Sequence, residues 1–150
     1  MSLQKLYNNP TLSIKTVDDS TTYTSLSDLR KTIHALVTEE AKNSNVIKFH
    51  ISESDTVKNP KDHSDHLYSS KIMQDIASDF QQVTLNLYEE YVTRYKPVNV
   101  KGHDYMISIG TWGATASGLS DNHHFSTWDD FHNSFLGKQY FRKVLITKQE

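Results

Sequence analysis

The chain contains no cysteine, and this absence removes several kinds of protein from consideration. Without thiols there is no disulfide framework, no thiolate zinc site and no cysteine nucleophile. Glycine and proline are also scarce, with 5 and 3 in 150 residues, so the chain is neither collagen-like nor a low-complexity linker. A chain of this length can bury enough surface to fold unaided. We therefore expect that folding requires no cofactor.

An excess of positive charge is missing as well. The 16 lysines and arginines face 18 aspartates and glutamates, for a net charge of -2, and no third of the chain is basic. Nucleic-acid and anionic-lipid binding both depend on basic surfaces, so this balance argues against either partner.

Long apolar runs are absent too. None approaches the ~18 residues of a membrane span, and residues 1–9 do not resemble a signal peptide. These features predict a soluble, cytoplasmic protein without membrane contact. The abundance of Asn, Ser, Thr, Lys and Tyr is typical of a low-GC bacterium or its phage.

Alternating apolar residues predict strands at both ends of the chain and in its first half, over 11–17, 46–51 and 142–148. Between the first two strands, Ser25-Leu-Ser-Asp28 reads as a capping box and predicts a helix over about 26–42. Residues 52–65 are polar, hold Pro60 and show no period, so they are predicted to form a long loop.

The second half is predicted to begin with a long helix. Apolar and aromatic residues there recur every three or four positions up to Pro97, at Ile72, Ile76, Phe80, Val83, Leu87, Tyr91 and Tyr95. A hairpin over about 98–112 follows, because Tyr105, Ile107 and Ile109 alternate. The glycines of 110–124 predict a loop, and Ser126-Thr-Trp-Asp129 predicts a short helix up to Gly137.

Together these elements predict one α+β domain over residues 1–150, in the order β-α-β-α-β-β-α-β. The strand-helix-strand start favours a parallel crossover, and the hairpin adds antiparallel pairing. We expect a mixed sheet of four or five strands with helices mainly on one face.

Histidines clustered with acids are the unusual feature of the sequence. They occur as Asp62-His63-Ser-Asp65-His66, Gly102-His103-Asp104 and Asp121-Asn-His123-His124. Imidazoles and carboxylates are the metal ligands available to a chain without thiols. A divalent metal held by His63, His66 and one of His103, His123 or His124 would make the chain a metal-dependent hydrolase, with Asp65 or Asp104 as base. Against this, the spacing matches no known ligand pattern, and polar loop histidines commonly form plain surface.

No complete catalytic signature is present: the P-loop lysine, the dinucleotide glycines and the Gly-x-Ser-x-Gly elbow are all missing. Aromatic residues near the glycine-rich segment suggest a ligand or interface site that includes Trp112, Tyr105 and His124. We therefore expect a small binding or interaction module with a regulatory role, whose partner is a protein or small molecule. A homodimer fits this expectation, and the metal-dependent hydrolase is the alternative.

Overall fold

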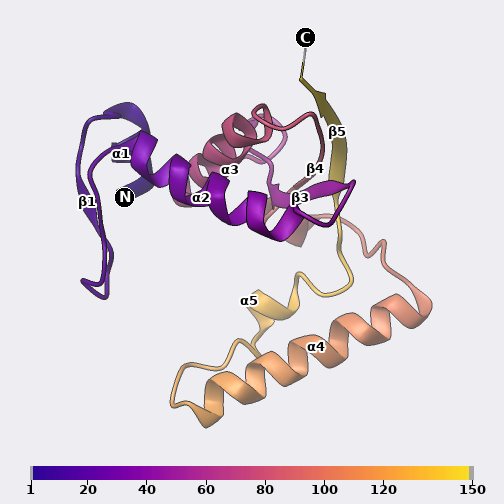
Figure 1. Cartoon of the computed structure of the whole chain (residues 1–150). Helices are drawn as coiled ribbons and strands as arrows, with labels where there is room; N and C mark the ends of the chain where they lie inside the picture. The colour runs from indigo at the N-terminus through magenta and orange to yellow at the C-terminus, as the bar shows by residue number, and fades with distance from the viewer. Residues whose placement is uncertain (1, 149–150) are drawn as a thin grey trace. The chain divides into compact units, whose positions relative to one another are not determined.

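The chain contains both helices and strands, and its strands pair both parallel and antiparallel, which confirms the α+β class (Figure 1). The structure is a computed structural model that describes residues 2–148. Its contacts divide the chain into two units: unit 1 is Met1–Glu90 with Phe141–Glu150, and unit 2 is Tyr91–Tyr140. That the two units form one domain over residues 1–150 stays a prediction.

The main sheet of unit 1 has three strands, with β4 in the centre. Strand β3 (Ile47–Ser52) runs parallel to β4 (Gln82–Tyr88), and β5 (Phe141–Thr147) runs antiparallel to it. A separate antiparallel pair joins β1 (Ile14–Lys15) and β2 (Thr22–Tyr23). Parallel and antiparallel pairing coexist, which confirms a mixed sheet. The predicted partners were wrong, because β1 and β3 lie in different sheets, and so was the single sheet of four or five strands.

Three helices complete unit 1: α1 (Ser2–Asn8), α2 (Leu26–Ala41) and α3 (Ser64–Ala77). Helix α2 begins where the sequence predicts, because Ser25 Oγ accepts a hydrogen bond from the Asp28 N–H at 3.1 Å. The Asp28 carboxylate accepts from Thr24 N, one residue earlier than in a standard capping box.

Two hydrophobic clusters stabilise unit 1. The first contains Phe49 of β3, the alternating residues Val83, Leu85 and Leu87 of β4, and Ala77 of α3. Val37 of α2 and Met73 of α3 pack against this cluster. The second gathers Leu6, Leu26, Ile72 and Ile76 from the three helices. Helices α2 and α3 thus contribute to the core on one face of the sheet.

The helix predicted from Ile72 to Tyr95 was wrong. The structure ends α3 at Ala77, forms β4 over Gln82–Tyr88 and then a 3₁₀ turn, η1 (Tyr91–Tyr95). Val83 and Leu87 are four residues apart, a spacing that fits one face of a helix and equally one face of a strand. Leu85, which the helical stripe left out, is buried between them and marks the period of two.

The hairpin over 98–112 and the loop over 110–124 were also wrong. Unit 2 instead contains one long helix, α4 (Gly102–Asp121), followed by α5 (Asp130–Asn133). The predicted element order therefore fails in this half of the chain, and it also lacks α1 and β2 at the N-terminal end, where the strand predicted over 11–17 is the two-residue β1. No helix within residues 2–148 is long and apolar enough to cross a membrane.

Unit 2 is held together by polar and aromatic contacts. Trp112 on α4 donates a hydrogen bond from Nε1 to Asn133 Oδ1 at 3.0 Å. The Arg94 guanidinium lies 4.6 Å from the centre of the Phe131 ring. Gly137 has a left-handed φ of 69°, and a Cβ there would lie 2.4 Å from Tyr105 Cε2. Glycine is therefore required at 137.

Candidate functional site

Polar side chains gather where β3 and β4 end. The two strands are parallel and in register from Ile47 opposite Val83 to Ser52 opposite Tyr88, so their carboxyl ends lie side by side. After Ser52 the chain forms a loop that leads into α3. Ligands of open α/β sheets bind at this edge, because loops and helix N-termini meet there.

Glu53, the first residue after β3, carries a buried carboxylate. Arg142 on β5 pairs with it twice: Nε contacts Oε2, and Nη2 lies 3.1 Å from Oε1. The Asp55 N–H donates to Oε1 at 3.0 Å. The hydrogen bond to Glu53 raises the pKa of Arg142 above its ordinary value. A buried carboxylate needs such partners, and here they join the end of β3 to β5.

Asn59 is fully buried and connects three segments of this edge. Its Nδ2 donates to the Glu53 carbonyl oxygen at 3.0 Å and to Asp62 Oδ2 at 2.7 Å. Its Oδ1 accepts from the Glu90 N–H at 3.0 Å. One amide side chain therefore fixes the loop after β3, the start of α3 and the end of β4 relative to one another.

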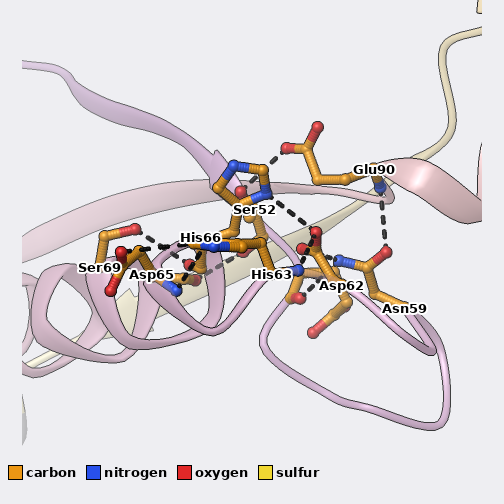
Figure 2. A network of polar contacts seen from close by, with 10 residues as sticks. Ser52, Asn59, Asp62, His63, Asp65, His66, Ser69 and Glu90 are labelled. Atoms are coloured by element: carbon orange, nitrogen blue, oxygen red, sulfur yellow. Dashed lines mark hydrogen bonds and ion pairs between the residues drawn. The ribbon is translucent and has the colours of Figure 1, made fainter. Parts of the chain in front are cut away.

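Asp62 and His66 form a pair across the first turn of α3. The Asp62 side chain is fully buried, and its Oδ1 lies 2.9 Å from His66 Nδ1. The same oxygen accepts from the His63 N–H at 2.8 Å. Figure 2 shows Asp62, His66, Asn59 and Glu90 close together. A buried carboxylate held on both sides sets the orientation of the imidazole, as in many binding and catalytic sites.

A pocket of about 320 Å³ opens beside this network. Its lining includes the hydroxyls of Ser52 and Ser69, the Glu90 carboxylate, the paired His50 and Tyr88, and the apolar Met73. Ser52 Oγ donates to Glu90 Oε1 at 2.9 Å, and His50 Nδ1 lies 2.9 Å from the Tyr88 hydroxyl. The pocket thus combines an apolar wall with several ordered polar groups, as ligand sites do.

The histidines singled out as metal ligands divide between the two units. His63 and His66 lie together in unit 1, with ring centres 5.6 Å apart. His103 and His123 lie near opposite ends of α4, a 20-residue helix and so roughly 30 Å long. Within residues 2–148, no group of three or more His, Asp or Glu side chains is arranged to hold a metal ion.

Several of these histidines have local structural contacts. His63 is the N-cap of α3, where its Nδ1 accepts from the Asp65 N–H at 3.3 Å. His123 adopts a left-handed φ of 59°. The N–H groups of His123 and His124 donate to the carbonyl oxygens of Ser120 and Leu119, which is the Schellman arrangement at a helix end.

The residues predicted to bind a ligand, Trp112, Tyr105 and His124, all belong to unit 2. Trp112 and Tyr105 are half-buried against Asn133 and Gly137, and His124 is exposed beyond the end of α4. None of the three lines the pocket at the ends of β3 and β4. Whether they bind a ligand of their own stays a prediction.

Sequence patterns did not single out Glu53, Asn59 and Glu90, and they noted Asp62 merely as a neighbour of the histidines. A usable signal was the polar run Ser52-Glu-Ser-Asp55 directly after a well-predicted strand. Comparisons with protein-family models, curated proteins and solved structures find no match, so the site's own geometry is the evidence for its role.

Proposed function

We propose that the chain is a binding module for a small polar molecule, held in the pocket beside Ser52, Ser69 and Glu90. One observation carries this proposal. The pocket lies at the carboxyl ends of a parallel strand pair, and the buried Asn59 accepts from the N–H of Glu90, a lining residue, while bonding Glu53 and Asp62 through its amide nitrogen.

The energetic argument concerns the buried groups. Glu53 is buried but the Arg142 side chain is 42% exposed, and a partly exposed ion pair adds little net stability, so stability alone is a weak reason for this pairing. A fixed arrangement of polar groups lowers the entropy lost when a ligand binds. The network joining Glu53, Asn59 and Asp62 supports a role in holding the pocket's geometry.

The lining indicates the ligand's charge. Among the described residues that border the pocket, Glu90 contributes a carboxylate and no lysine or arginine is present. Ser52, Ser69 and Tyr88 add hydroxyls that accept as well as donate. A compact molecule with an amine or guanidine group and a short aliphatic part fits this lining, with Met73 against the aliphatic part.

The test is a titration of isotope-labelled protein with agmatine, followed by amide NMR shifts. We expect saturable shifts at Ser52, Ser69 and Glu90, loss of binding in Glu90→Gln and retention in Glu89→Gln, the adjacent carboxylate that does not border the pocket. Inorganic phosphate serves as the anionic probe. Shifts at this edge with phosphate and none with agmatine would contradict the assigned charge.

A metal-dependent hydrolase, the alternative from the sequence, has less support. Its ligand set would need one of His103, His123 or His124 beside His63 and His66, and no group of three His, Asp or Glu within residues 2–148 is arranged to hold a metal ion. The contacts around His63 and His123 already account for those residues as helix caps. We keep the hydrolase as a hypothesis that a melt with added zinc tests.

A further inference from the structure

Helix α4 has an inner and an outer face. At 100° per residue, Tyr105, Ile109, Trp112, Ala116 and Leu119 share one side, and each is buried or half-buried. The opposite side is exposed along its whole length and consists of His103, Met106, Ile107, Gly110, Ala114, Ser117, Gly118 and Asp121.

The composition of this outer face is unusual for a helix in contact with water. Met106 is 65% exposed and Ile107 is 53% exposed, and α4 contains no lysine or arginine. A solvent-facing helix surface normally carries charged residues. At Gly110 and Gly118 a Cβ would meet nothing within 4 Å, so the surface there is open to a neighbour.

Sizes and charges on the outer face are distributed in a self-complementary way. Residues equally far from position 112 form the pairs Met106 with Gly118, Ile107 with Ser117, and Gly110 with Ala114. Each of the two large side chains is matched by a small residue. At the ends of the face, His103 is matched by Asp121, an imidazole with a carboxylate.

We propose that this face binds a second copy of the chain, with the two α4 helices antiparallel about a two-fold axis beside position 112. A two-fold axis brings residues equally far from it together, so each helix inserts Met106 and Ile107 over Ser117 and Gly118 of the other. His103 of one copy meets Asp121 of the second copy. A parallel pair would instead place Met106 on Met106 and Asp121 on Asp121.

The small residues allow the helices to approach closely, toward the short end of the usual 8–10 Å interaxial range. The contact is a strip about 30 Å long and about 10 Å wide, the diameter of a helix, so it covers roughly 300 Å², below the ~800 Å² per partner of a standard interface. We therefore expect a reversible dimer with a dissociation constant in the micromolar range.

Sedimentation velocity from about 1 to 500 µM tests the dimer. The wild-type chain should shift from monomer to dimer in this range, and Gly110→Leu should remain a monomer at every concentration. Leucine favours a helix over glycine, so this variant stays folded, which circular dichroism checks. Thr115→Leu, on an exposed part of α4 away from this face, is the matched control and should dimerise. A wild type that is monomeric throughout, or a Gly110→Leu dimer of unchanged affinity, overturns the proposal.

A charge swap tests the antiparallel register. His103→Asp faces the carboxylate of the second copy's Asp121, so the dissociation constant should rise about tenfold or more. Asp121→His added to the same chain should recover most of that loss. If the double variant dimerises no better than His103→Asp, the register is wrong.

Discussion

The two units of the chain are stabilised in different ways. Unit 1 buries nine of its large and small apolar residues in two clusters: Leu6, Leu26, Phe49, Ile72, Ile76, Ala77, Val83, Leu85 and Leu87. Unit 2, which is described throughout residues 91–140, buries Thr93, Ala116 and Gly137 and no large apolar side chain.

Exposure shows a weaker contrast of the same kind, because the described part of unit 1, about twice as long, exposes six large apolar side chains: Val17, Leu36, Val46, Val57, Phe141 and Leu145. Eight large apolar side chains are exposed in unit 2: Tyr91, Tyr95, Val98, Met106, Ile107, Phe125, Trp128 and Phe131. Exposed apolar surface of this kind marks interaction sites in soluble proteins. The described part of unit 1 therefore has the larger apolar core, whereas unit 2 exposes more apolar surface for its length, which is where we propose that a partner binds.

A phenylalanine-to-alanine substitution in each unit should give the largest difference in the free energy of unfolding. Phe80 packs against both clusters of unit 1 and stacks on His34 with ring centres 4.8 Å apart. Phe80→Ala should lower the free energy of unfolding by about 2–3 kcal/mol, somewhat less than for a fully buried phenylalanine. Phe125 is 97% exposed, and Phe125→Ala should change stability by less than about 0.5 kcal/mol. Urea denaturation measures both, and equal losses would contradict the division.

Two glycine substitutions test how closely side chains pack in unit 2. Gly137→Ala adds a Cβ 2.4 Å from Tyr105 Cε2 at a left-handed φ of 69°, so it should destabilise unit 2 by roughly 1–3 kcal/mol. Gly113→Ala, whose Cβ would meet Trp128 at 3.8 Å, should be neutral or stabilising because alanine favours a helix. Thermal melts followed by Trp fluorescence distinguish them. A neutral Gly137→Ala would show that Tyr105 does not pack there.

A smaller effect should appear on acidification. The His132 backbone N–H, and then the His132 side chain, lower the pKa of Asp129 from its ordinary 3.8. A depressed carboxyl pKa adds stability that is complete above about pH 4 and is lost as the pH falls through the folded-state value. Asp129→Asn keeps a capping side chain and removes the charge, so its melting temperature should be below wild type at pH 7 and equal near pH 2. Asp130→Asn is the neighbouring control. A difference that is constant with pH would exclude the charge as its cause.

Zinc should have no effect on stability. Melts at pH 7.5 with and without zinc should coincide for the wild type, because the histidine clusters are divided between α3 and the ends of α4. A rise of several degrees that disappears in both His63→Ala and His123→Ala would favour the hydrolase, since a metal bound to the folded state stabilises it.

Local patterns predicted the elements whose signals are unambiguous. Ser25 is the N-cap of α2, as the capping box predicted. The bounds of β3 and β5 lie close to those predicted from their alternating apolar residues. The failures came from patterns that fit two structures. In α4, Tyr105, Ile107 and Ile109 alternate like a strand, although Tyr105, Ile109, Trp112 and Ala116 recur at helical spacing. Four glycines, Gly102, Gly110, Gly113 and Gly118, lowered the apparent helix propensity of this segment.

The candidate site was harder to predict, because its contacts join distant positions. Glu53 pairs with Arg142, 89 residues away, and Asn59 accepts from Glu90, 31 residues away. No local period connects such residues, and the strand register that brings them together depends on β4, which the helical interpretation of Val83 and Leu87 concealed.

Hydrogen–deuterium exchange at two protein concentrations tests the division between the units most directly. Amides of β4 should exchange slowly and at the same rate at about 5 and 500 µM, because the core of unit 1 is complete in each chain. Amides of α4 should exchange faster at the low concentration and become protected at the high one, as the outer face is covered by a second copy. Concentration-independent protection of α4 equal to that of β4 would contradict the account.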